Sequence, residues 1–250
     1  MLEGSINEWD VRRQIIIPGD KEQTIEFAAA HFAHSAERAI QQHGKFAVAL
    51  SGGSTPQAIF QNLAANYKKE VNWTQVYLFW SDERAVGPDH PDSNYKMAME
   101  NGFNELPIPP SQIFRMKGEG NLQKNAEEYE DLIKRKLDKR LFDLVMLGIG
   151  EDGHTASLFP KTAALEEKNK LVVANHLSEQ NSWRMTLTLT CINQSEKAVI
   201  YAIGASKETI VPLALNAAII SAFPVSAVGT AEHPALWVID QASSRLLTIP

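Results

Sequence analysis

Residues 46–67 read FAVALSGGSTPQAIFQNLAANY, and the architecture of the chain can be worked out from this stretch. Its first five residues are all apolar, which is typical of a short strand that is buried on both faces of a sheet. Pro56 then favours the start of a helix, because the N–H that proline lacks would have no partner in the first helical turn. The stretch therefore predicts a buried strand at 46–50, a glycine-containing loop and a helix at 56–67.

The same alternation continues on both sides of this stretch. A helix over 21–43 is predicted by its apolar spacing and by Gly44, a favourable residue just past a helix end. Alternating strands and helices indicate an α/β fold with a mostly parallel sheet, which we expect to form a single domain over residues 1–250. The other predicted strands are 14–17, 76–80, 142–147, 171–174, 185–189, 198–203 and 236–239, and the other predicted helices are a short one after Asp92 or Ser93, 122–137 and 207–220.

Composition narrows the class of protein. The chain has 24 Lys and Arg against 30 Asp and Glu, a net charge of −6, and 44% hydrophobic residues. These values fit a globular domain and argue against disorder and against broad nucleic-acid binding. The single Cys191 excludes a disulfide framework and fits a cytoplasmic protein, and no apolar run reaches the ~18–20 residues that a membrane span needs. We expect a monomer or a small homo-oligomer without nucleic-acid or membrane partners.

The first candidate site is the loop that follows the strand at 46–50. In a parallel sheet, ligands bind beyond the carboxyl ends of the strands. This loop contains two glycines, which let the backbone approach an anion, and it leads into a helix N-terminus with free N–H groups. It lacks the Gly-Lys-Ser/Thr ending of a nucleotide-binding P-loop. The loop is therefore a candidate anion cradle, formed by Ser51, Gly52, Gly53, Ser54 and Thr55.

Two further loops place charges at the same kind of position. The apolar strand at 76–80 is followed by Asp82, Glu83 and Arg84. Adjacent charges at such a position cost free energy unless they are solvated or bind a ligand. Arg84 can bind a phosphate or a carboxylate through two parallel hydrogen bonds. Lys207 lies at the strand-to-helix junction after 198–203 and can supply a positive charge to a phosphate.

The loop GIGEDGHTAS at 148–157 carries the strongest candidate for acid–base chemistry. His154 is the one histidine of the seven that lies in a glycine-rich loop at a strand end. Imidazole titrates near neutral pH, which suits a general base. Asp152 is two residues away and could orient the ring or bind the substrate.

Two other interpretations of these loops compete with this one. Gly148, Gly150 and Gly153 match the G-x-G-x-x-G fingerprint of dinucleotide binding, but no acidic residue ends a strand about 20 residues further on. Ser51, Asp82 and His154 follow the chain order of an α/β-hydrolase triad. Against the triad, Ala49 replaces the first glycine of the nucleophile elbow, and about 100 residues still follow the histidine.

Three motifs together resemble the 6-phosphogluconolactonases. They are ALSGGSTP at 49–56, DER at 82–84 with DSNY at 92–95, and LGIGEDGHTASLFP at 147–160. The resemblance implies a Rossmann-like fold, with a mostly parallel sheet and helices on both faces, that is shared with glucosamine-6-phosphate isomerase. It also implies hydrolysis of a sugar-phosphate lactone, 6-phospho-D-glucono-1,5-lactone, in the oxidative pentose phosphate pathway, without a cofactor or a metal.

Glucosamine-6-phosphate deaminase is the related alternative, and two positions separate it from this chain. The deaminases typically have an aromatic residue after Asp-Glu, where this chain has Arg84. They also have a glutamate five residues beyond the histidine for ring opening, where this chain has Phe159. A lactone is already an acyl electrophile, so its hydrolysis needs no ring-opening acid.

The resemblance also suggests roles for single residues. His154 would be the general base, with Asp152 orienting it or the sugar, and Arg84 or the backbone amides of 52–54 would stabilise the oxyanion. The glycine loop, Arg184 and Lys207 would hold the 6-phosphate, and Asp82 is expected in the same pocket. One departure concerns the stretch SEQNSWRMTLT at 178–188, which keeps Arg184 but lacks the Lys-Pro-Pro that lactonases commonly have before it.

Overall fold

The computed structural model describes residues 6–137, 141–217 and 222–248. Their main element is a seven-stranded sheet with the order β1-β2-β10-β9-β6-β3-β4. Its neighbours all pair in parallel except β1, which is antiparallel to β2. The strands are β1 (Asn7–Asp10), β2 (Arg13–Ile16), β3 (Phe46–Leu50), β4 (Val76–Trp80), β6 (Leu144–Gly148), β9 (Ala198–Ala202) and β10 (Ala235–Ile239). The predicted α/β class and the mostly parallel sheet are confirmed.

The helices lie mostly where the sequence predicts them. They are α1 (Lys21–His43), α2 (Ser54–Asn66), α3 (Asn94–Glu100), α4 (Leu122–Leu137), α5 (Leu189–Asn193) and α6 (Ile210–Leu215). Helix α1 begins at a capping box between Asp20 and Gln23 and ends at Gly44, whose φ of 83° is left-handed; both devices satisfy terminal backbone groups. The long helix predicted at 207–220 is instead the single turn η6 (Ala205–Lys207) followed by α6, and its last predicted residues lie outside the described part of the chain.

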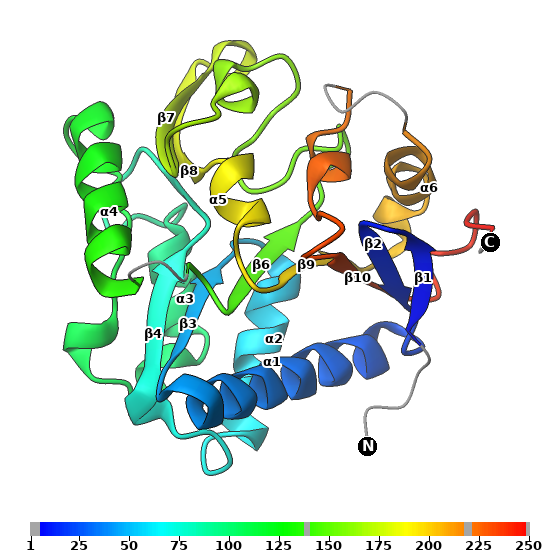
Figure 1. Cartoon of the computed structure of the whole chain (residues 1–250), viewed down its shortest axis with the longest axis horizontal. Helices are drawn as coiled ribbons and strands as arrows, with labels where there is room; N and C mark the ends of the chain where they lie inside the picture. Colours follow the sequence, from blue (N-terminus) through cyan, green and yellow to red (C-terminus); the bar gives the residue numbers. More distant parts are fainter. Residues whose placement is uncertain (1–5, 138–140, 218–221, 249–250) are drawn as a thin grey trace.

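A second, smaller sheet corrects the sequence-based topology. Its order is β5-β8-β7, all antiparallel, with β5 (Asp82–Arg84), β7 (Val172–Leu177) and β8 (Ser182–Leu187). Figure 1 shows β7 and β8 at the top of the molecule, away from the long helix α1 at the bottom. The segments predicted at 171–174 and 185–189 therefore do not extend the parallel sheet. The segment 81–84, predicted as a loop, contains β5, because antiparallel pairing with β8 overrides the low strand preference of its charged residues.

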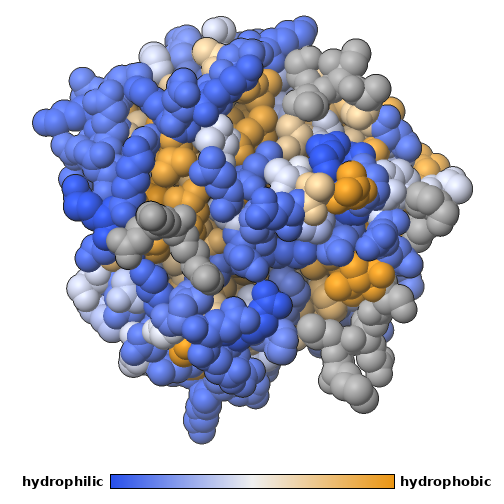
Figure 2. Space-filling view, in the orientation of Figure 1, coloured by the Kyte–Doolittle hydropathy of each residue, from blue (hydrophilic) through white to orange (hydrophobic). Residues whose placement is uncertain are grey.

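The surface is polar with scattered apolar areas. On the face shown in Figure 2, hydrophilic side chains predominate, and hydrophobic ones appear between them in several separate areas. Such exposure is ordinary for a folded domain. Within the described ranges no helix has the length and the hydropathy required to cross a bilayer.

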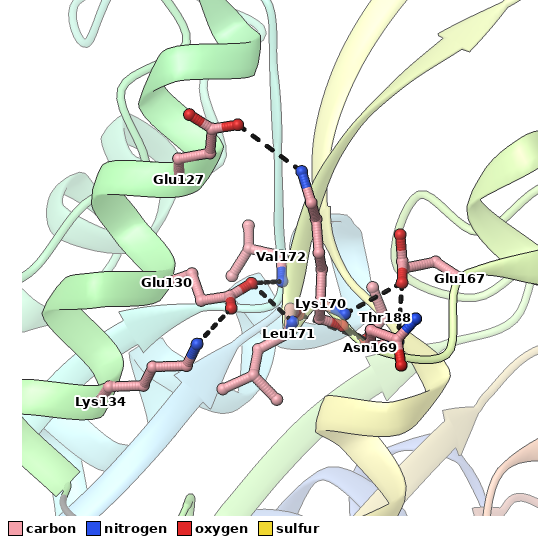
Figure 3. A network of polar contacts seen from close by, with 9 residues as sticks. All are labelled: Glu127, Glu130, Lys134, Glu167, Asn169, Lys170, Leu171, Val172 and Thr188. Atoms are coloured by element: carbon pink, nitrogen blue, oxygen red, sulfur yellow. Dashed lines mark hydrogen bonds and ion pairs between the residues drawn. The ribbon is translucent and has the colours of Figure 1, made fainter.

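Helix α4 holds the small sheet through Glu130 (Figure 3). One carboxylate oxygen of Glu130 accepts hydrogen bonds from the backbone N–H groups of Leu171 (2.7 Å) and Val172 (3.2 Å), and the other oxygen binds Lys134. Burial alone would raise the pKa of the Glu130 carboxyl, but these hydrogen bonds outweigh burial and lower it from its ordinary value of 4.5. The start of β7 is thus tied to α4 by an ionised side chain.

We expect Glu130→Ala to lower the free energy of unfolding at pH 7 by on the order of 2 kcal/mol, because two amides lose a charged acceptor. The stabilisation is present above the ordinary carboxyl pKa and is lost as the pH falls through the lowered pKa of the folded state. Urea unfolding at pH 7 and at pH 3 measures both effects. Glu127→Ala removes only an exposed ion pair to Lys170 at 3.6 Å and should change little. Equal losses in the two variants would contradict the assignment.

Candidate active site

The candidate active site is a cavity of about 270 Å³ at the carboxyl ends of the parallel strands, where this class of fold binds ligands. Four loops converge on it, those that follow β3, β4, β6 and β9. The predicted residues that it brings together are Ser51, Gly52, Gly53, Asp82, Arg84, His154 and Lys207. Asn94, at the start of α3, also lines the cavity. Asn94 belongs to one of the sequence motifs, but its pattern alone predicted no place for it in the site.

His154 is held by Asp152. Its Nδ1 lies 2.6 Å from Oδ1 of Asp152, and its backbone N–H donates to the same oxygen at 3.1 Å. With Nδ1 as the donor to the carboxylate, Nε2 carries the free lone pair. Within the described ranges Nε2 has no hydrogen-bond partner in the protein. The ring can therefore accept a proton from a water molecule in the cavity, and Asp152 is placed to orient it.

The ring of His154 is also fixed from its sides. The ring of Phe159 stacks on it at 4.0 Å between centroids and 18° between planes. On another side, a β-carbon added at Gly150 would lie 2.1 Å from Nδ1 of the histidine. The glycine at 150 thus leaves the space that the paired ring occupies, and packing together with the Asp152 hydrogen bond limits the ring to one orientation.

The glycine loop offers backbone donors. Gly53 has a φ of 101° and caps α2 without any side-chain hydrogen bond to the first turn. A helix N-terminus of this kind attracts anions through its free N–H groups and its dipole. Ser51, Gly52 and Gly53 line the cavity, whereas Ser54 and Thr55 form the first turn of α2 and lie outside its lining.

Two arginines meet beside the cavity. Arg84 on β5 is the direct register partner of Arg184 on β8. Arg84 lines both the cavity and an adjoining groove of about 680 Å³, whereas Arg184 lines only the groove. Burial, followed by the positive charge of Arg84, lowers the pKa of Arg184. In the described ranges neither guanidinium forms an ion pair with a carboxylate, so two adjacent cations face a space that favours an anion.

The carboxylates that follow β4 are already bound inside the protein. Glu83 accepts hydrogen bonds from the backbone N–H groups of Arg84 (2.8 Å), Asn94 (2.8 Å) and Tyr95 (2.9 Å), and burial raises the pKa of its carboxyl. Asp82 binds Ser157 and Asn94 and does not reach His154. Since the partner of His154 is Asp152, the Ser51–Asp82–His154 triad that the sequence left open does not form. Among the described residues no group of three or more His, Cys, Asp or Glu is arranged to bind a metal.

Comparisons with known proteins point to one family. A family model described as Glucosamine-6-phosphate isomerases/6-phosphogluconolactonase matches residues 19–237. The 6-phosphogluconolactonase of Chlamydia muridarum is 40% identical over 232 residues, covering 93% of this chain and 90% of the relative. The one from Haemophilus influenzae is 32% identical over 202 residues, covering 80% and 87%. The solved 6-phosphogluconolactonase of Trypanosoma brucei has a TM-score of 0.83 at 26% identity, covering 94% of this chain and 98% of that one.

Proposed function

The chain belongs to the glucosamine-6-phosphate isomerase/6-phosphogluconolactonase family, and within it we propose that this protein hydrolyses 6-phospho-D-glucono-1,5-lactone to 6-phospho-D-gluconate, a step of the oxidative pentose phosphate pathway. The observation that carries the proposal is the His154–Asp152 pair, at 2.6 Å, with a free Nε2. This pair faces a cavity that also contains Arg84 and Lys207. A base and two cations in one cavity match a substrate that has an acyl electrophile and a phosphate.

In the mechanism we propose, water attacks the lactone carbonyl while Nε2 of His154 takes one of its protons. Asp152 holds the opposite side of the ring and stabilises the imidazolium that forms. The ring oxygen of the lactone then leaves with the proton that His154 returns, and the carbonyl carbon becomes the carboxyl group of the product. General-base assistance contributes about 10²–10⁴-fold. The route requires no covalent intermediate and no metal.

The tetrahedral intermediate needs donors for its oxyanion. The candidates are the guanidinium of Arg84 and the backbone N–H groups of 52–54, which belong to other loops than the one that carries His154. Donors that are already oriented towards a developing charge commonly contribute more to acyl-transfer catalysis than any other single effect. The 6-phosphate would bind the remaining cations, Lys207 in the cavity and Arg184 in the adjoining groove, together with the start of α2.

Glucosamine-6-phosphate deamination is not favoured. Its ring opening needs an acid beside the histidine, and Phe159 occupies that place, stacked at 4.0 Å on His154. Arg84 likewise stands where the deaminases have an aromatic residue. We further propose that the protein works as a single α/β domain in the cytoplasm, as a monomer or a small homo-oligomer.

The function is tested with lactone that is made in place from glucose 6-phosphate by its dehydrogenase. We expect the protein to remove the lactone well above the spontaneous rate and to release no ammonia from glucosamine 6-phosphate. A rate equal to the spontaneous one would overturn the proposal. Ammonia release in its place would favour the deaminase.

Lys207→Met is expected to raise KM for the lactone about tenfold or more, with a smaller change in kcat. A charge-assisted contact contributes about 1.5–3 kcal/mol, and about 1.4 kcal/mol corresponds to a factor of ten. The comparison is made by steady-state kinetics at low and high salt, since the difference between the two proteins should shrink as salt screens the ammonium. Lys69→Met, at an exposed position after α2, serves as the control. An unchanged KM would place the phosphate elsewhere.

A further inference from the structure

Asp82 connects three of the loops that form the candidate active site. Its side chain is buried, and Oδ2 accepts a short hydrogen bond of 2.6 Å from Oγ of Ser157. Nδ2 of Asn94 donates both to Oδ1 of Asp82 (3.2 Å) and to its backbone carbonyl (2.9 Å). In the described ranges Asp82 forms no ion pair with a cation. Hydrogen bonds from Ser157 and Asn94 therefore hold this carboxylate in place of a counter-ion.

Asn94 connects Asp82 to the glycine loop. Its backbone N–H donates to Oε1 of Glu83 at 2.8 Å, so the residue is held at both its main chain and its side chain. Its Oδ1 is buried, has no hydrogen-bond partner among the described residues, and packs directly on Gly52. A β-carbon added at Gly52 would lie 2.0 Å from that oxygen and 2.5 Å from Cγ. The amide of Asn94 thus sets the position of the Gly52 backbone.

Ser157 connects Asp82 to the loop that carries His154. It lies three residues beyond His154, is 2% exposed, and its backbone N–H donates to Oγ1 of Thr186 at 3.2 Å. Its carbonyl accepts from Nδ2 of Asn175 at 2.9 Å. The main-chain atoms of Ser157 are thus bound to the small sheet. Its hydroxyl adds a hydrogen bond that connects the loop of the base to Asp82.

We propose that Asn94 and Ser157, which Asp82 joins, are positioning residues for the hydrolysis. The inference rests on the proposed function, because it assigns phosphate binding and general-base catalysis to two different loops. This buried set of side chains connects the loops that follow β3, β4 and β6. Asn94 fixes the anion-binding glycine loop, whereas Ser157 fixes the loop of the general base. A misplacement of about 1 Å in such geometry can cost on the order of 10²-fold in rate.

The two roles predict different kinetic effects. Ser157→Ala is expected to lower kcat about 10- to 100-fold and to leave KM within about threefold, because the base shifts while the phosphate contacts stay. Asn94→Ala is expected mainly to raise KM, about tenfold, because the glycine loop is released. Ser195→Ala, which removes a buried hydroxyl bonded to the Cys191 carbonyl at 2.9 Å, is the matched control for lost stability. A kcat for Ser157→Ala equal to that of the control would overturn the proposal.

A double-mutant cycle tests the contact between Asn94 and Gly52 directly. Gly52 has no left-handed φ, and the three atoms nearest to an added β-carbon all belong to the Asn94 amide. We expect Gly52→Ala to reduce kcat/KM at least tenfold in the wild-type background and less than threefold in the Asn94→Ala background. Equal reductions in both backgrounds would contradict the coupling.

Melting temperatures of the same four proteins give a readout that needs no substrate. Gly52→Ala should destabilise the protein more in the wild-type background than in the Asn94→Ala background, where the amide that the new methyl group would meet is gone. If the wild type fails to hydrolyse the lactone, the proposed function is wrong while the melting cycle still tests the contact. If the wild type is active and the cycle is additive in both readouts, the inference alone is wrong.

Discussion

Replacing His154 with alanine should reduce kcat for lactone hydrolysis by about 10²–10⁴-fold, the contribution of a well-placed general base. The reason is geometric, since the imidazole is the group in the cavity whose lone pair is free while its other nitrogen is bound to Asp152 at 2.6 Å. KM should change little, because the cations proposed to bind the phosphate stay in place. The measurement is the lactone assay with substrate made in place, corrected for spontaneous hydrolysis.

The pH dependence adds a second readout to the same variant. Only the neutral imidazole accepts a proton, so the wild-type rate should fall as the pH is lowered, and the residual rate of His154→Ala should lose that dependence. His34→Ala, at an exposed position on α1, controls for the loss of a histidine as such. Full activity in His154→Ala would move the base elsewhere. Asp82 and Glu83 are not free to replace it, because both are held by hydrogen bonds inside the protein.

Local signals in the sequence were sufficient for much of the fold. The extent of α1 follows from its apolar spacing and its end from Gly44, and β3 follows from five apolar residues ahead of a glycine turn. These elements depend on interactions within a few residues. The loop positions followed as well, because a parallel sheet collects them at one edge. His154, Arg84 and Lys207 therefore come together as the sequence predicted.

What could not be predicted depends on pairing between distant segments. Strand β5 is made of three charged residues and exists because it pairs with β8. That pairing sets Arg84 opposite Arg184, about a hundred residues away in the sequence, and no local pattern encodes it. The place of Asn94 in the site likewise depends on its contacts with Asp82 and Gly52. A motif can mark such a residue, but only the packed structure shows what its amide touches.

The second large effect is expected from a single methyl group, in Gly150→Ala. The added β-carbon would lie 2.1 Å from Nδ1 and 2.2 Å from Cε1 of His154, and 2.7 Å from Oδ1 of Asp152. These distances are far below van der Waals contact, so the ring must leave its position between Asp152 and Phe159. We expect kcat to fall about 10²-fold or more, because the base is displaced while it remains chemically intact. Stability should change little, because Gly150 has no left-handed φ and the ring can turn towards the cavity.

Gly148→Ala, at the last residue of β6 and two residues before Gly150, is the matched control. It adds the same methyl group at another cavity-lining glycine without a left-handed φ, but its β-carbon would meet nothing within 4 Å. Steady-state kinetics of the two variants, together with their melting temperatures, separates ring displacement from a general disturbance of the loop. Equal losses of kcat would mean that the loop tolerates no side chain at all. A loss confined to Gly150→Ala would show that the rate depends on where the imidazole is held, and that its presence alone is insufficient.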